Sequence, residues 1–113
     1  MHRVSVHSGT TTVVVEAAGE LDAYAADDLE HAFATARVSR QMVVDFAGVS
    51  FLDSTALGVV VRGIREVGEA GGRALIVLPE STARRIFEIT TLDKVLPVAA
   101  SREAALRELE GAS

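Results

Sequence analysis

The side chains best suited to chemistry belong to three consecutive residues, Asp53, Ser54 and Thr55. They belong to a segment, residues 49–58, that we expect to link a short apolar strand to a segment with helical spacing. Connections of this kind are where α/β sheets display functional groups. One use of these residues is structural, because an Asp or Ser oxygen at a helix start satisfies backbone N–H groups that lack an intrahelical partner.

A second use of the same geometry is modification of a hydroxyl. A helix N-terminus carries free N–H donors and a partial positive charge, so it tolerates an added phosphate. A phosphate on Ser54 would add about one to two negative charges to an exposed loop. It would repel a partner fitted to a neutral hydroxyl and leave the fold intact. The residues therefore allow capping and also a reversible switch that needs no catalysis by this chain.

Catalytic and metal-binding constellations are missing from the sequence. His2, His7 and His31 do not stand at ligand spacing, and the chain has no cysteine. Neither a G-x-S-x-G elbow nor a glycine-rich phosphate loop is present. A hydrolase with Ser54 as nucleophile would need a base within reach, and no histidine is placed to serve. We therefore expect no enzyme activity, no cofactor and no metal.

A phosphoaspartate receiver is a related alternative, because Asp45 and Asp53 lie near expected strand ends. That site also needs an acidic pair after the first strand and a lysine near the last. Lys94 is the only lysine, and no acidic pair follows either early strand. We set the receiver interpretation aside.

Composition limits the class of protein. The chain has 113 residues, of which 49% are hydrophobic, which fits one domain over residues 1–113. The net charge of −5 and the lack of a basic cluster argue against nucleic-acid binding. No apolar stretch approaches the roughly 20 residues that span a bilayer, and no secretory signal is evident. We expect a cytoplasmic protein that binds neither membrane nor nucleic acid.

Strand and helix patterns alternate along the chain. Val13, Val14 and Val15 are continuously apolar, as expected of a strand covered on both faces. Strands that alternate with helices imply βαβ units, so we predict one α/β domain with a mixed, largely parallel sheet and about four helices. In order, we expect strands at 4–7 and 11–18 around a turn at 8–10, a helix capped by Asp22, a strand at 42–46, a helix from Leu57 to a stop at Gly71–Gly72, a strand at 73–78, a helix capped by Ser81, a short strand or turn at 92–98, and a helix capped by Ser101.

Two glycines interrupt the helical pattern that follows Thr55. A glycine inside a helix costs about 1 kcal/mol relative to alanine, so each invites a reason. Close approach of the helix to the sheet or to a partner would account for Gly58. Gly63 reads as a tolerated defect.

Three motifs carry a resemblance to a known family. The segment Gly19-Glu20-Leu21-Asp22, residues 51–59 (FLDSTALGV) and residues 85–92 (RIFEITTL) resemble the bacterial anti-sigma factor antagonists, which are stand-alone STAS domains. The motifs occur in the family's order, and the similarity covers almost the whole chain. The fold that this resemblance implies agrees with the one that the periodicity predicts.

The resemblance implies a mechanism called partner switching. In that family the unphosphorylated antagonist binds an anti-sigma factor, which is a serine/threonine kinase, and thereby frees the sigma factor. The kinase phosphorylates the residue after the motif aspartate, and a PP2C-type phosphatase restores the active form. The nucleotide belongs to the kinase, so no ATP site is expected on this chain.

Carried over residue by residue, the resemblance assigns Ser54 as the phosphoacceptor, with Thr55 as the alternative. It implies that Asp53 helps to fix the loop and that Asp22 lines the neighbouring one. The chain departs from the family at Ala56, where glycine is common. The residues expected to contact the partner are Asp22, Asp53, Ser54, Thr55, Ala56, Leu57 and Gly58.

A second hypothesis keeps the fold and omits the phosphorylation. Some small STAS proteins act as constitutive subunits of larger assemblies, such as lipid transporters or stress-signalling complexes. Failure of any kinase to modify Ser54 or Thr55 would favour this alternative.

Overall fold

A five-stranded sheet with the order β1-β2-β3-β4-β5 organises the protein in the computed structural model, which describes residues 1–9, 11–36, 39–78, 82–94 and 96–111. β1 pairs with β2 antiparallel, and the other neighbours are parallel. The mixed, largely parallel sheet is therefore confirmed. The elements are β1 (His2–Ser8), β2 (Thr12–Leu21), α1 (Ala23–Ala36), β3 (Gln41–Leu52), α2 (Ser54–Glu69), β4 (Arg73–Val77), α3 (Thr82–Ile89), the 3-10 turn η1 (Leu92–Lys94), β5 (Val98–Ala99) and α4 (Arg102–Gly111).

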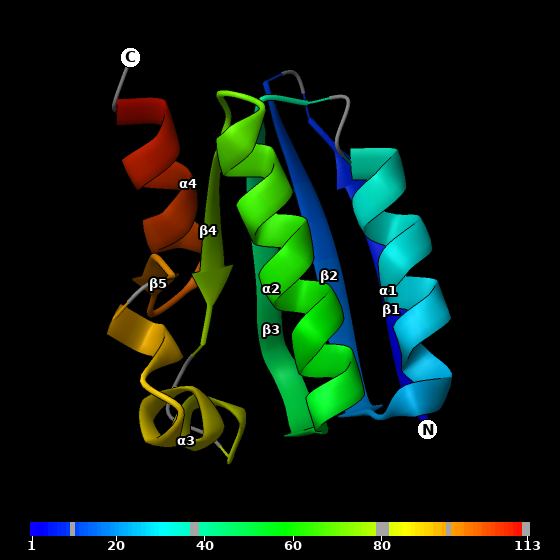
Figure 1. The fold of residues 1–113 in the computed structure, drawn as a ribbon. Coiled ribbons are helices and arrows are strands. Elements are labelled where there is room, and N and C mark those ends of the chain that lie inside the picture. Colours follow the sequence, from blue (N-terminus) through cyan, green and yellow to red (C-terminus); the bar gives the residue numbers. More distant parts are fainter. Residues whose placement is uncertain (10, 37–38, 79–81, 95, 112–113) are drawn as a thin grey trace.

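Both faces of the central strands are covered. Figure 1 shows α1 and α2 side by side on one face of the sheet, where Val13 and Val15 of β2 join the larger core. Val14 points the opposite way and packs with Ala105 and Leu109 of α4 in a second, smaller core. Burial on both faces explains the unbroken valine run. None of the described helices is long and apolar enough to cross a membrane.

β2 and β3 run further than the sequence pattern predicts. β3 extends to Leu52, so residues 49–52 are strand and the link to α2 is Asp53 alone. Gly48, which lies beyond the strand predicted at 42–46, is part of β3 and lies opposite Ala18, where a Cβ on the glycine would come within 3.0 Å of the alanine Cβ. The β2–β3 register shifts beside this pair. A glycine at an irregularity permits close strand approach without ending the strand.

The predicted helix signals mostly hold. The hydroxyl of Ser101 accepts a hydrogen bond from the Ala104 amide at 3.1 Å, as expected of a cap. α2 ends just before Gly71, which takes a left-handed φ of 86°. The expected segment at 92–98 becomes η1 followed by the two-residue strand β5. Ser81, the expected cap of α3, and Thr10, in the expected turn at 8–10, lie outside the described residues.

Of the two glycines singled out in the helical pattern, Gly63 and not Gly58 allows close packing inside the protein. A Cβ on Gly63 would come within 2.7 Å of the Phe33 ring on α1, so this glycine lets the two helices approach. A Cβ on Gly58 would meet only the Arg62 guanidinium at 3.9 Å, and no sheet atom lies nearby. The prediction that Gly58 allows close approach to the sheet is therefore wrong, and close approach of a partner at this glycine stays a prediction. Sequence spacing cannot reveal which helix face meets a bulky ring on another helix.

Candidate functional site

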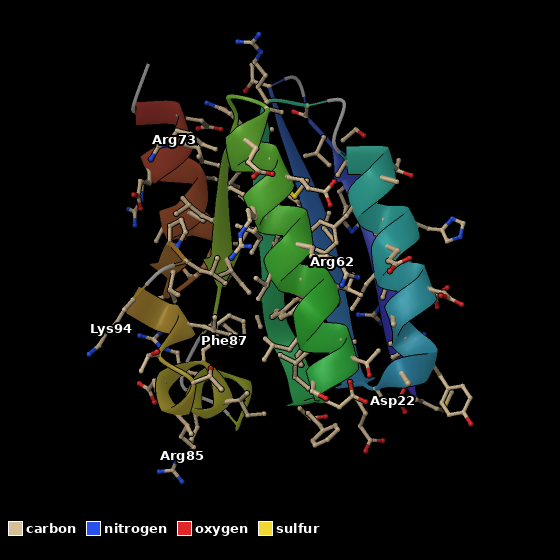
Figure 2. The ribbon with its side chains drawn as sticks, viewed as in Figure 1. Asp22, Arg62, Arg73, Arg85, Phe87 and Lys94 are labelled. Carbon is tan, nitrogen blue, oxygen red and sulfur yellow. The ribbon has the colours of Figure 1, made fainter. Side chains whose placement is uncertain are left out.

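Two loops meet at the end of the sheet where α1 and α2 begin. Leu21 and Leu52 are register partners at the ends of β2 and β3, so the residues that follow them emerge side by side. The backbone N–H of Asp53 donates to the carbonyl oxygen of Leu21 at 3.0 Å. Figure 2 shows Asp22 at the start of α1, at the same end of the molecule as the start of α2. The parallel register therefore brings the two predicted aspartates into adjacent loops.

Each of these aspartates caps a helix. An Asp53 carboxylate oxygen accepts a hydrogen bond from the Ala56 amide at 2.9 Å, and the Asp53 backbone is extended. An Asp22 oxygen accepts from the amides of Tyr24 and Ala25 at 3.0 and 3.3 Å. The prediction that residues 53–55 cap a helix is thus confirmed, and the capping group is the Asp53 carboxylate rather than a hydroxyl.

The hydroxyls of Ser54 and Thr55 take no part in capping α2. Both residues are exposed and occupy the first two positions of α2. Neither hydroxyl makes a hydrogen bond within the part of the chain that the structure describes. The first N–H groups of a helix have no intrahelical acceptor, and Asp53 satisfies only that of Ala56. Two solvent-facing hydroxyls therefore stand beside unpaired donors at the positive end of a helix.

The remaining predicted contact residues are less exposed. Leu57 and Gly58 are half-buried, and Leu57 packs against the larger core. Ala56 is fully buried, so its methyl group fills space beneath the loop. A glycine in its place would leave that space empty. The departure from the family pattern at this position is thus accommodated inside the protein.

Sequence reasoning missed three exposed apolar side chains on elements that reach this end of the molecule. Tyr24, Phe51 and Ile89 are 86%, 44% and 74% exposed, and they are three of the four large hydrophobic residues that are exposed in the described chain. Tyr24 opens α1, and Phe51 nearly ends β3. Ile89 ends α3, which Figure 1 shows at the same end of the molecule as the starts of α1 and α2. These three exposed residues therefore belong to elements that meet the end of the molecule where Ser54 lies.

Asp45, considered above as a phosphoacceptor, is occupied elsewhere. It is buried, and one of its carboxylate oxygens accepts from Nε of Arg102 on α4 at 2.7 Å. Arg102 also donates to Glu16 on β2 at 2.8 Å. The hydrogen bond that Arg102 donates to Asp45 is the main cause that raises the pKa of the Arg102 guanidinium above its ordinary value. This cluster joins α4 to the sheet and takes no part in the site at Ser54.

The histidines on β1 pair with single carboxylates. His2 contacts Asp28 of α1 at 2.7 Å, and His7 contacts Glu16 at 3.1 Å. Within the described ranges, no three His, Asp or Glu side chains gather as a metal site would require. The chemistry that the site offers is therefore that of two exposed hydroxyls beside two capping carboxylates.

Comparison with known proteins gives matches along most of the chain. The family model described as STAS domain matches residues 3–105. An anti-sigma-B factor antagonist of Bacillus subtilis is 30% identical over 105 residues, which cover 92% of this chain and 96% of the relative. The crystal structure of an anti-sigma factor antagonist from Mycobacterium paratuberculosis is 25% identical, with a TM-score of 0.87 and coverage of 97% and 95%. The phosphorylated form of the Bacillus cell-fate determinant SpoIIAA is 28% identical, with a TM-score of 0.71 and coverage of 93% and 98%.

Proposed function

Because the chain belongs to the STAS domain family, among the anti-sigma factor antagonists, we propose that it binds an anti-sigma factor of the serine/threonine kinase type and is switched off by phosphorylation at Ser54. The unmodified protein holds the kinase and thereby frees a sigma factor. Phosphate on Ser54 breaks this complex, and a PP2C-type phosphatase regenerates the binding form. The chain itself catalyses neither step.

The observation that carries the proposal is the state of the Ser54 hydroxyl. It is exposed and makes no hydrogen bond among the described residues, while the adjacent Asp53 does the capping. A kinase can therefore reach the oxygen without first breaking a structural contact. The relative SpoIIAA has a solved structure in its phosphorylated form, which supports a phosphate on this fold.

The switch follows from what an interface tolerates. A neutral hydroxyl loses little when a partner covers it, because one hydrogen bond replaces its water. A phosphate carries about 1.5 to 2 negative charges and strong hydration, so covering it without a matched cation is costly. Asp22 and Asp53 already place two carboxylates at this end of the molecule. The added charge is therefore repelled locally as well as being costly to bury.

The partner surface that we propose combines this polar centre with the apolar residues around it. Interfaces usually have an apolar core with aromatic anchors and a polar rim. Tyr24 and Phe51 supply exposed aromatic rings from the two elements that flank Ser54. Ile89 extends the surface to α3. A partner that covered these residues would also cover the hydroxyl, which explains how one phosphate can end binding.

The test is intact mass after incubation with ATP and the kinase-type anti-sigma factors of the source organism. The wild type is expected to gain one phosphate, and Ser54→Ala to gain none. Thr55→Val is the matched control, because it removes the adjacent hydroxyl and leaves Ser54 in place. A gain that survives Ser54→Ala and disappears in Thr55→Val would move the switch by one residue.

A binding measurement separates the switch from the alternative of a constitutive subunit. Unmodified protein should bind the anti-sigma factor, and protein phosphorylated by that kinase should not. If no kinase modifies either hydroxyl, the phosphoswitch is wrong and the constitutive role is favoured.

A further inference from the structure

β1 forms an open edge of the sheet, and the proposed function does not use it. The sheet order places β2 on one side of β1 and no strand of the described chain on the other. An edge strand exposes a row of N–H and C=O groups that can pair with another extended chain. Proline, lysine, a β-bulge or a very short strand commonly blocks such an edge. β1 has seven residues in unbroken register with β2 and contains neither proline nor lysine, so none of these devices protects it.

The backbone groups of alternate β1 residues face outward. At one end of the β1–β2 hairpin the Glu20 amide donates to the Met1 carbonyl at 3.0 Å, and at the other the Gly9 amide donates to the Thr12 carbonyl at 2.9 Å. Hydrogen-bonded pairs recur at every second residue of an antiparallel ladder, so the odd-numbered residues of β1 bond to β2. The N–H and C=O groups of the even-numbered residues point to the open edge. Within the part of the chain that the structure describes, no hydrogen bond occupies these outward groups.

α1 lies over one face of β1. The side chains of Val4 and Val6 are half-buried and pack against the larger core on that face. α1 contacts both β1 and β2 (Figure 1), which places the helix over this pair of strands rather than beyond the edge. Two copies joined along β1 would hold their α1 helices about two strand spacings apart, about 10 Å, which is a usual distance between packed helices. The fold therefore allows two such edges to meet.

The other face of β1 carries a cation and a carboxylate that do not meet each other. Arg3 and Ser5 point away from the larger core, because Val4 and Val6 point into it. Arg3 is exposed and has no ion pair among the described residues. Glu16 of β2 lies opposite Ser5, and its side chain is 32% exposed. Each Glu16 carboxylate oxygen has one hydrogen-bond partner inside the chain and can accept another.

We propose that β1 pairs with β1 of a second copy of this chain, antiparallel and with the two-fold axis at Val4, to form one continuous sheet. Val4 then lies opposite Val4 of the second copy, and the two exchange backbone hydrogen bonds. The outward groups of Val6 bond in the same way to those of His2 of the second copy. Because the contact is isologous, every interaction forms twice.

Charge selects this register. With the axis at Val4, Arg3 lies opposite Ser5 of the second copy, and Glu16 of that copy lies on the strand behind. The Cα atoms of Arg3 and this Glu16 are then two strand spacings apart, about 9.6 Å, which an extended arginine and a glutamate can span. The next register that keeps the hydrogen bonds would place Arg3 opposite His7 of the second copy, which adds a basic group and moves the carboxylate away.

The experiment measures mass and amide exchange on the same protein. Sedimentation equilibrium between about 10 μM and 1 mM should show an average mass that rises from one chain toward two, because association follows mass action. Over this range, exchange of the Val4 and Val6 amides should slow at least about tenfold, and that of the Ser5 amide, which already bonds to β2, should change less. The mass of one chain throughout would overturn the proposal. A dimer whose Val4 and Val6 amides exchange as fast as in the monomer would also overturn it.

Variants test the edge and the charge separately. Val4→Pro removes an outward N–H and none that bonds to β2, so the protein should stay folded and monomeric. Arg3→Glu should raise the dissociation constant of the dimer at least about fivefold, because two carboxylates would then face each other. Arg107→Glu, at an exposed arginine on α4, makes the same change in net charge and should dimerise as the wild type does.

Two results with these variants would contradict the pairing. Dimerisation of Val4→Pro at wild-type strength would show that the β1 edge is not the interface. An equal effect of Arg3→Glu and Arg107→Glu would show that net charge, and not contact between Arg3 and Glu16, governs association. The amide spectrum of each variant establishes that it is folded.

Discussion

The N–H of Asp53 donates to the carbonyl of Leu21 at 3.0 Å, and this bond joins the loop before α2 to the loop before α1. It continues the β2–β3 register for one residue past the paired ends Leu21 and Leu52. The Asp53 side chain then caps α2, so the residue is held by both its backbone and its carboxylate. Ser54 follows directly. Its exposed hydroxyl is therefore presented from a fixed backbone, which suits recognition by a kinase and by a binding partner.

We expect loss of the α2 cap to lower stability. Asp53→Ala should reduce the free energy of unfolding by about 1 kcal/mol, because the Ala56 amide loses its acceptor. Asp53→Asn is the matched control and should stay close to wild type, since an amide oxygen also caps. Urea unfolding followed by circular dichroism measures both. Equal loss in the two variants would mean that the negative charge, rather than the hydrogen bond, supports the loop.

A charge at Ser54 should separate binding from folding. Ser54→Glu is expected to weaken binding to the anti-sigma partner at least about tenfold, because the interface would bury a charge. Its stability should match or slightly exceed wild type, because an acidic residue in the first turn interacts favourably with the helix dipole. Isothermal titration calorimetry measures the binding, and thermal unfolding measures the stability. Thr55→Val should bind as wild type, and tight binding by Ser54→Glu would argue against the switch.

The exposed aromatic residues should matter for binding and little for folding. Tyr24→Ser, at a side chain that is 86% exposed, is expected to weaken partner binding by about 1 to 2 kcal/mol. Its free energy of unfolding should change by less than about 0.5 kcal/mol. Glu69→Ser, at the exposed far end of α2, is the control and should do neither. A Tyr24→Ser protein that binds normally would remove α1 from the proposed surface.

Two of the three glycines in α2, Gly63 and Gly68, should respond oppositely to alanine. Gly63→Ala is expected to destabilise by about 1 to 2 kcal/mol, because its methyl group would overlap the buried Phe33 ring. Gly68→Ala has open space for the same methyl group and should stabilise by up to about 1 kcal/mol. Thermal unfolding of the pair tests the helix packing directly. A stabilised Gly63→Ala would show that α1 can move away at little cost.

The pairing of Arg102 with Asp45 should hold α4 on the sheet. Arg102→Met leaves a buried carboxylate without its cation, and we expect a loss of about 1 to 3 kcal/mol. We expect no larger loss of stability, because the Arg102 side chain is itself 38% exposed and water screens the ion pair. Arg107→Met, an exposed arginine on the same helix, is the control. Restoration of stability by Asp45→Asn in the Arg102→Met background would show that the unpaired charge causes the loss.

Local patterns in the sequence determined most of the elements. Alternation of valine-rich runs with helical spacing predicted the order of strands and helices, because burial on one or two faces leaves a period in the sequence. Capping residues such as Asp22 and Ser101 marked helix starts, since a cap acts on the next three residues. Residues 53–55 could be recognised as a possible helix start for the same reason, because capping involves only residues close in sequence. These are interactions between near neighbours in the chain.

Contacts between distant residues were decided only by the tertiary structure. Whether Gly58 or Gly63 meets a bulky neighbour depends on where Phe33 of α1 lies, which no spacing within α2 encodes. The extension of β3 past Gly48 depends on pairing with β2, which overrides the local turn preference of glycine. The gathering of Tyr24 and Ile89 at the end of the molecule that bears Ser54 likewise depends on how α1 and α3 pack on the sheet. Packing and register join segments far apart in sequence, so they appear only when the chain is folded.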